Sequence, residues 1–578
     1  MRDFLLFTTS PKVMSSPYPS LQTMELPNSE TWEIKPSPQL YAALETQFKP
    51  LQTTYPGMIR FARSNKLSNF LRFDHKWHLE SFLGDVPLRS GTFSARIQAF
   101  KDGKPEHITR DISGFCKITH LLDAYKVIQG NYPMAQHPCL PAPGKKSAKV
   151  YSKIHDPHNQ AYVDSVACYM LSKFREADHS PHFSLFYGAY LAIAKNYYYN
   201  ITEDFSDIRF DSWFWKNQKE GIFSLVALNG NVPLAADDPL IEAPEELYSD
   251  SESSTSSSSD SASKFEVGDK MSEVSGESLH SASISTTSEK SDETDESDGV
   301  EKGHRFFAKL SEFPTMLMFL ESNTDTMDSL LEDGNLNMDA EIGTQEWEDR
   351  WTAWLFQVIA ALCQIQSLWA MTHNDLHSNN ILWVPTDKEF FYYKTNDGRS
   401  WKVPTYGKLF RIIDFGRAIF THNGTLCISD DYWPENEAGT QYNFGPFYSP
   451  KEPRAYPNPS FDLCRLSVSI IEALFLENPP AEKEGGAIMS SENGRVQKET
   501  VSELFNVMWS WLIDDDGRNV LWDTDQSERY PGFDLYCVIA QKVKGAVPRE
   551  QLEKPLFTKF ACESSFVPEG EKVYSLFC

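Results

Sequence analysis

The stretch Met371-Thr-His-Asn-Asp-Leu-His-Ser-Asn-Asn-Ile-Leu-Trp383 decides the fold of this chain. It carries three polar residues at the spacing H-x-D-x-x-x-x-N, namely His373, Asp375 and Asn380. Residues 344–371 before it repeat Trp, Leu, Val and Ile at helical spacing, which predicts a long amphipathic helix. The apolar run at 380–384 predicts a strand, so the polar residues lie in a loop between the helix and the strand.

A second polar triplet, D-F-G at 414–416, follows the apolar run 409–413, which predicts another strand. Phosphate transfer from a nucleotide needs Mg²⁺ fixed on the phosphates and an acceptor hydroxyl held in line. A carboxylate and an amide oxygen for the metal, together with a carboxylate near the hydroxyl, meet that need, because Mg²⁺ prefers hard oxygen ligands. The pattern therefore indicates phosphate transfer. A buried polar turn is the alternative, and a zinc site at His373 and His377 is disfavoured because no H-E-x-x-H pattern or third ligand accompanies them.

The two motifs resemble the catalytic loop and the metal-binding motif of the protein kinase superfamily. The resemblance implies an α+β fold of two lobes, a small β-rich N-lobe and a larger helical C-lobe. It implies that Asp375 orients or deprotonates the acceptor hydroxyl, that Asn380 and Asp414 bind Mg²⁺ or Mn²⁺, and that His373, Phe415 and Gly416 are structural. His377 stands where haspin and the aminoglycoside and choline kinases have His, which implies that His377 is also a catalytic residue. Phrases such as Ser180-Pro-His-Phe-Ser-Leu-Phe-Tyr-Gly188 are similar to divergent kinase-like proteins of large DNA viruses and some protists.

The resemblance also implies a strand lysine that reaches the α- and β-phosphates of ATP. Lys117, in Ile112-Ser-Gly-Phe-Cys-Lys-Ile118, is similar to the lysine of V-A-I-K. Its carboxylate partner is expected on the helix predicted over 162–177, where Asp164 fits by phase and Glu176 is the alternative. Gly91, in Ser90-Gly-Thr-Phe-Ser-Ala-Arg-Ile97, resembles part of the loop that covers the phosphates.

Two further segments resemble parts of a kinase. Phe313-Pro-Thr-Met-Leu-Met-Phe-Leu-Glu-Ser322 is similar to the hinge between the lobes. This implies that Leu320 lines the adenine pocket and that the backbone of Glu321 and Asn323 pairs with adenine. Asp462 resembles the helix aspartate that braces the catalytic loop by accepting its backbone N–H groups.

As a whole, the resemblance implies an ATP-dependent protein kinase that transfers the γ-phosphate to Ser or Thr of protein substrates. Asn374 stands where most kinases have Arg, and an Asn cannot pair with a phosphate on the activation segment, so control by phosphorylation there is not expected. Two other functions stay open. One is a pseudokinase or scaffold that binds nucleotide or partners without transfer, and the other is a small-molecule kinase, which His377 motivates.

Composition divides the chain. Residues 1–84 mix Pro, Ser and Thr with isolated hydrophobics and are predicted to be a poorly ordered extension, followed by an N-lobe at 85–320 and a C-lobe at 321–578. The N-lobe carries an acidic, Ser-rich insert at about 236–303, within which residues 249–298 hold 19 Ser, 13 Asp plus Glu and three Lys. Such a segment has too little apolar surface to offset the entropy of ordering and is predicted to be disordered. It is either a solvated insert or a phosphorylated docking segment.

The whole chain has 54 Lys plus Arg against 81 Asp plus Glu, a net charge of −27, which argues against a nucleic-acid partner. Its nine Cys show no C-x-x-C pair, so neither a disulfide framework nor a structural zinc site is expected, and a reducing compartment fits best. No window approaches the ~18 consecutive apolar residues that indicate a membrane span. We expect a soluble intracellular protein, cytoplasmic or nuclear, whose partners are ATP and a protein substrate.

Overall fold

The computed structural model of the chain describes residues 29–62, 67–132, 138–147, 150–230, 232–234, 240, 304–331, 340–436, 438–481, 483–492, 495–523, 527–563 and 567–578. Strands and helices are mixed along these residues, which confirms the α+β class. The acidic insert predicted over 236–303 lies outside the described residues except for Leu240. Of the helices in the described ranges, none has the length and apolar character needed to cross a bilayer.

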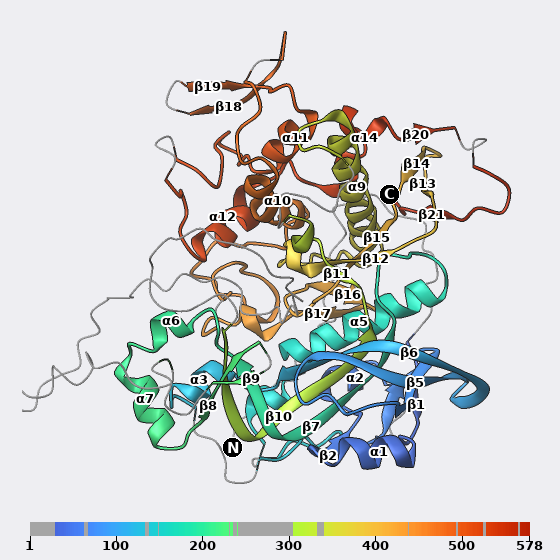
Figure 1. Cartoon of the computed structure of the whole chain (residues 1–578), viewed down its shortest axis with the longest axis vertical. Helices are drawn as coiled ribbons and strands as arrows, with labels where there is room; N and C mark the ends of the chain where they lie inside the picture. The colour runs from blue at the N-terminus through green and yellow to red at the C-terminus, as the bar shows by residue number, and fades with distance from the viewer. Residues whose placement is uncertain are drawn as a thin grey trace, which may run out of the picture.

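An eight-stranded antiparallel sheet forms one end of the molecule (Figure 1). Its strand order is β2-β7-β10-β6-β5-β4, with β8 paired to β10 and β9 to β8. Burial alternates along β5, with Phe93, Ala95 and Ile97 in the core and polar residues between them, as a strand with one buried face requires. The strands are β2 (Phe48–Gln52), β4 (Trp77–Phe82), β5 (Gly91–Lys101), β6 (Lys104–His120), β7 (Phe186–Asn200), β8 (Ser224–Asn229), β9 (Val232–Pro233) and β10 (His304–Glu321).

The chain leaves this sheet after β9 and returns to it at the start of β10. His304, the first residue of β10, lies opposite Asn229, the last residue of β8. The strands at the two ends of the intervening segment, β9 and β10, therefore both pair with β8.

The prediction of a poorly ordered extension over 1–84 is wrong for residues 31–62 and 67–82. β2 pairs with β7 and β4 pairs with β5, so both belong to the large sheet. This segment also contains β1 (Thr31–Glu33), β3 (Leu71–Phe73), α1 (Pro38–Leu44) and α2 (Pro56–Ile59). Its isolated hydrophobic residues are core residues, and Tyr55 is an example: its ring stacks on Tyr162 with 5.3 Å between centroids. Composition did not indicate this order because the partners lie far along the chain.

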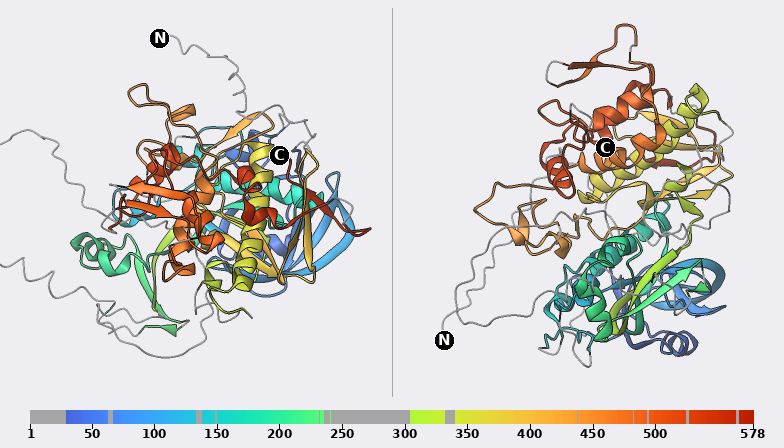
Figure 2. Two further views of the ribbon diagram at one scale, coloured as in Figure 1. Left: turned by 90° about the horizontal axis from the view of Figure 1, so that it is seen from above. Right: turned by 60° about the vertical axis from the view of Figure 1, so that its left-hand side comes forward.

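The helix predicted over 162–177 is α5 (Gln160–Glu176). It begins after Asn159, whose side-chain oxygen accepts the N–H of Ala161. Most of its residues are buried, because α5 lies between the sheet and the helical remainder of the molecule (Figures 1 and 2). The other helices of this half are α3 (Ala124–Ile128), α4 (Ser152–His155), α6 (Phe205–Ile208) and α7 (Ser212–Lys219).

The other end of the molecule is built around the long helix predicted over 344–371, which is α9 (Gln345–Trp369). Thr344 caps its N-terminus by accepting the N–H of Trp347, and Ala370 ends it with a φ of 47°. The remaining helices are α10 (Phe461–Leu474), α11 (Glu503–Trp511), α12 (Asp534–Lys542), α13 (Pro548–Gln551) and α14 (Pro555–Thr558).

Short strands and turns complete this end. The three-stranded sheet β11-β12-β15 and the four-stranded sheet β20-β14-β13-β21 flank α9, and β16-β17 and β18-β19 are hairpins. The strands are β11 (Asp325–Thr326), β12 (Ile381–Pro385), β13 (Phe390–Lys394), β14 (Ser400–Pro404), β15 (Lys408–Ile412), β16 (Phe420–His422), β17 (Thr425–Cys427), β18 (Ile488–Glu492), β19 (Arg495–Lys498), β20 (Ala561–Cys562) and β21 (Val573–Ser575). Single 3₁₀ turns are η2 (Asp328–Leu330), η4 (Ser378–Asn380), η5 (Asp430–Tyr432) and η6 (Gly445–Phe447). The predicted strands at 380–384 and 409–413 are thus confirmed as β12 and β15.

His182 ties the two ends together and gives the fold a pH dependence. Its Nδ1 lies 2.9 Å from the carbonyl oxygen of Phe410, so Nδ1 carries the proton, and its Nε2 accepts the hydroxyl of Tyr393 at 2.8 Å. Burial lowers the pKa of His182 from 6.5 to about 4. The neutral ring therefore contributes stability that is complete above pH 6.5 and is lost as the pH falls towards 4.

We expect the melting temperature of the protein to fall as the pH is lowered from 6.5 to 5, with His182 contributing up to about 1.4 kcal/mol per pH unit. Thermal unfolding at a series of pH values should show a shallower slope for His182→Gln than for the wild type. His107→Gln, at an exposed His, should keep the wild-type slope. An unchanged slope in His182→Gln would rule out this assignment.

Candidate active site

A cavity of about 950 Å³ lies between the large sheet with α5 and the loops that follow α9 and β15. Most of the site residues predicted from the sequence line this cavity: Lys117, Asp164, Leu320, Glu321, Asn323, His377, Asn380, Asp414, Phe415 and Gly416. Asp375, His373 and Asp462 lie behind this lining. Gly91 is not part of it.

Lys117, on β6, is the positive centre of the cavity. Its Nζ lies 2.7 Å from Asp164 Oδ2 and 2.8 Å from Asp414 Oδ1. Burial alone lowers the pKa of Lys117, but the two carboxylates outweigh burial and raise the pKa, so the side chain is an ammonium at neutral pH. The expected ion pair with Asp164 is present. The alternative partner, Glu176, instead accepts the backbone N–H of Lys76 at 3.0 Å, and burial raises its pKa to about 7.

Asp462, at the start of α10, fixes the loop that follows α9. Its two carboxylate oxygens accept the N–H groups of His373 and Asn374 at 3.0 and 2.9 Å. His373 in turn donates from Nε2 to the carbonyl of Ile413 at 2.8 Å, and the N–H of Asp375 lies 3.3 Å from its Nδ1. The loop before η4 and the loop after β15 are therefore bound to each other and to α10.

The side chain of Asn374 makes only neutral hydrogen bonds in the contacts that the structure describes. Its Oδ1 accepts the hydroxyl of Tyr442 at 2.6 Å, and its Nδ2 donates to the carbonyls of Thr372 and Arg417 at 3.2 and 3.1 Å. The side chain is fully buried. No positive charge stands at this position for a phosphate to pair with.

Asn380 presents an oxygen that suits a metal ion. Its Nδ2 donates to the carbonyl of Asp375 at 2.8 Å and to His377 Nε2 at 3.0 Å, and these two acceptors fix the orientation of the amide. Among the described residues, Oδ1 of Asn380 is buried and has no hydrogen-bond partner. With the carboxylate of Asp414 in the same cavity, it forms a pair of hard oxygen ligands that fits Mg²⁺.

Asp375 carries a buried negative charge. Burial alone raises its pKa, but the nearby positive charges, that of Arg417 first and that of Arg465 with it, together outweigh burial and lower the pKa, so Asp375 is a carboxylate at neutral pH. Burial lowers the pKa of His377, which agrees with a neutral ring that accepts from Asn380.

Glu321 lies at the end of β10, and one of its two backbone groups is already paired. Its backbone N–H donates to the carbonyl of Leu185 at 2.9 Å and is therefore not available to adenine. Its carboxylate pairs with Arg175 of α5 and with Arg411 of β15, 3.1 Å away. Asn323 is fixed by the same Arg411, which donates to its Oδ1 at 2.9 Å.

Gly91 also differs from expectation. It is the first residue of β5 and lies opposite Cys116 of β6, while its neighbours Ser90 and Thr92 reach the cavity. Ser90 is itself fixed, because its Oγ accepts the N–H of Ile118 at 2.9 Å. A single Gly in a loop-like phrase did not distinguish a strand start from a phosphate-binding turn.

Several cavity residues had no signal in the sequence. Arg465 lines the cavity and donates to the hydroxyl of Tyr536 at 2.9 Å. Arg465 lies three residues after Asp462 on α10, so one helical turn connects it to a predicted residue. Tyr536 lies on α12, and no pattern linked that helix to the site.

The chain was compared with models of known protein families and with curated protein sequences, and neither comparison gave a match.

Proposed function

We propose that the chain is an ATP-dependent protein kinase that transfers the γ-phosphate of ATP to serine or threonine side chains of proteins. The observation that carries the proposal is the contact of Lys117 with both Asp164 and Asp414 in the cavity that also holds Asn380. These residues come from β6, α5, the loop after β15 and η4. A cation, carboxylates and an amide oxygen that converge in one cavity meet the needs of a nucleotide with Mg²⁺.

The proposal includes a two-lobed, kinase-like arrangement. The large sheet and α5 would be the N-lobe, and the part from Glu321 onward the C-lobe. In support, the sheet and the helices α9 to α12 lie at opposite ends of the molecule (Figure 2), and residues of both ends line the cavity. Strand β10 runs from the sheet directly to the cavity lining at Leu320 and Glu321.

Each residue then has a chemical task. Lys117 binds phosphate oxygens as an ammonium, and Asn380 Oδ1 and the Asp414 carboxylate would hold Mg²⁺. When bound, the metal ion neutralises charge on the phosphates. Asp375, ionised at neutral pH, holds the acceptor hydroxyl and takes its proton as the phosphorus–oxygen bond forms. His377 keeps its Nδ1–H as a donor for a phosphate oxygen. Adenine recognition falls to the Glu321 carbonyl and the Asn323 backbone.

Incubation of the chain with γ-labelled ATP, Mg²⁺ or Mn²⁺ and generic protein acceptors should label Ser and Thr of those acceptors. Asp414→Asn, prepared identically, should transfer no label, which excludes a contaminating kinase. Binding of ATP without transfer would favour the pseudokinase, and labelling of aminoglycoside or choline in place of protein would favour the small-molecule kinase. A chain that does not bind ATP would contradict all three.

A further inference from the structure

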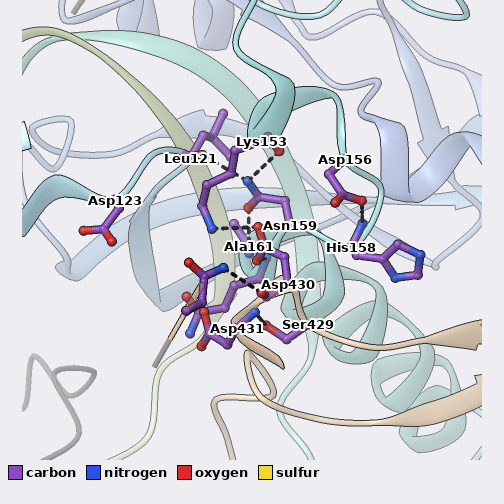
Figure 3. A network of polar contacts seen from close by, with 12 residues as sticks. Leu121, Asp123, Lys153, Asp156, His158, Asn159, Ala161, Ser429, Asp430 and Asp431 are labelled. Carbon is purple, nitrogen blue, oxygen red and sulfur yellow. Dashed lines mark hydrogen bonds and ion pairs between the residues drawn. The ribbon is translucent and has the colours of Figure 1, made fainter. Parts of the chain in front are cut away.

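Asp430 reaches from the segment that follows Asp414 to the start of α5 and to the preceding helix α4, where it meets Lys153 (Figure 3). Lys153 Nζ lies 2.6 Å from Asp430 Oδ2, although the two residues are 277 positions apart in the sequence. The other oxygen, Oδ1, accepts the N–H of Gln160, the first residue of α5, at 2.9 Å. The Asp430 side chain is 5% exposed, so this is a buried carboxylate with both oxygens bound.

Backbone contacts fix Asp430 in this place. Its N–H donates to the carbonyl of His158 at 2.7 Å, and His158 Nδ1 lies 3.0 Å from the carbonyl of Ile428. The side-chain amide of Asn436 donates to the carbonyl of Asp430 at 2.8 Å. Backbone hydrogen bonds at Ile428 and Asp430 therefore join this segment to His158, just before α5.

A second contact joins the same segment to α5 one helical turn further along. Phe415, next to Asp414, donates its N–H to Asp164 Oδ1 at 3.0 Å, and Asp164 Oδ2 is the oxygen that pairs with Lys117. Gln160 and Asp164 lie on the same face of α5. If the start of α5 moved away from the segment, Asp164 would move away from Lys117.

The cost of the Lys153–Asp430 pair falls on its carboxylate: burial alone lowers the pKa of Lys153, but Asp430 and Asp431 outweigh burial and raise that pKa, which favours the ammonium. Burial raises the pKa of Asp430 to about 6, although Lys153 and the Gln160 N–H act in the opposite direction. At neutral pH the ionised carboxylate is therefore held at a net cost. A buried charge kept at a cost is consistent with a group whose use is to fix a geometry.

We propose that Asp430 and Lys153 are positioning residues that hold α5, and through it Asp164 on Lys117, without a phosphate on the segment 414–433. This proposal rests on the proposed phosphate transfer. A carboxylate encoded in the sequence supplies the negative charge that phosphorylation adds elsewhere. The neutral side-chain bonds of Asn374 agree with it, because this position itself supplies no cation for a phosphate to pair with.

Steady-state kinetics on the full chain at pH 7.5, where Asp430 is ionised, test this role. Asp430→Asn and Lys153→Met should each lower kcat/KM for ATP by about tenfold or more, a change of about 1.4 kcal/mol in the barrier. Lys153→Arg, which keeps the charge, should retain most of the wild-type value. The matched control is Asp74→Asn, because Asp74 is also a shielded carboxylate that binds α5, through Lys173 at 2.8 Å, but at the other end of the helix. It should stay within about twofold of the wild type.

Hydrogen exchange of the same proteins separates this proposal from the proposed function. Peptides that cover Gln160 and Phe415 should exchange faster in Asp430→Asn than in Asp74→Asn, whether or not the wild type transfers phosphate. If the wild type transfers no phosphate but Asp430→Asn still exchanges faster than Asp74→Asn, the proposed kinase activity is wrong and the positioning role stands. Equal exchange in the two variants, or wild-type kcat/KM in Asp430→Asn, would overturn the role. If Asp430→Asn does not fold, the same two measurements on Lys153→Met test the role instead.

Discussion

Asp375→Asn should lower kcat for phosphate transfer by about 10²- to 10⁴-fold while ATP binding and the melting temperature stay close to those of the wild type. The amide has the shape of the carboxylate but cannot take a proton from the acceptor hydroxyl. In the wild type the positive charges around Asp375, that of Arg417 first, together outweigh burial and lower the pKa of Asp375, so the base is present throughout the neutral range. The loss in the variant should therefore be the same at pH 6.5 and pH 8.

The measurement is kcat and KM for ATP, with ATP affinity determined separately by calorimetry. Asp325→Asn is the control, because Asp325 also lines the cavity but its Oδ1 accepts the N–H of the adjacent Thr326 at 2.8 Å. It should keep kcat within about twofold. Wild-type kcat in Asp375→Asn would remove Asp375 from the chemistry, and a parallel loss of ATP affinity would make its role one of binding.

Lys117→Met should weaken ATP binding by more than about tenfold and also destabilise the fold by roughly 3 kcal/mol. The single ammonium is shared by Asp164 and Asp414, whose side chains are 3% and 12% exposed. Its removal leaves two close carboxylates without their shared cation, and it also removes the cation that binds the phosphates. One substitution thus has two separable effects.

The variant Lys173→Met separates the effect on ATP binding from the effect on stability. Lys173 pairs with Asp74 at 2.8 Å, with side chains 16% and 11% exposed, so its loss also breaks a shielded ion pair. We expect a comparable drop in melting temperature and an unchanged ATP affinity, measured by thermal unfolding and calorimetry. Equal ATP affinities in Lys117→Met and the wild type would contradict the assignment of Lys117 to the phosphates.

Local patterns in the sequence predicted the parts of this structure that local interactions determine. Helix α9 follows from its apolar periodicity, and the loop with His373 and Asn380 follows from its spacing. The pairing of Lys117 with a carboxylate 47 residues away was expected from the resemblance to kinases, and the phase of the helix selected Asp164 as that carboxylate.

Long-range contacts between irregular segments could not be predicted in this way. The place of Tyr55 in the core depends on Tyr162, and the charge of Asp430 is balanced by Lys153, 277 residues earlier. Nor does the sequence say which backbone groups are already paired, as the N–H of Glu321 is with Leu185. These long-range contacts depend on which surfaces of the folded chain meet, and the local periodicity of the sequence does not encode which surfaces meet.

The attachment of the sheet at Asn229 and His304 has a consequence for the evolution of the chain. Strands β8 and β10 pair with each other directly and β9 pairs with β8, so this pairing does not require the residues between β9 and β10 to have any particular length. The entropy of closing a loop grows only with the logarithm of its length, about 0.6 kcal/mol for each doubling. Residues can therefore be gained or lost between β9 and β10 with little effect on folding. A reporter domain inserted there should leave the fold intact.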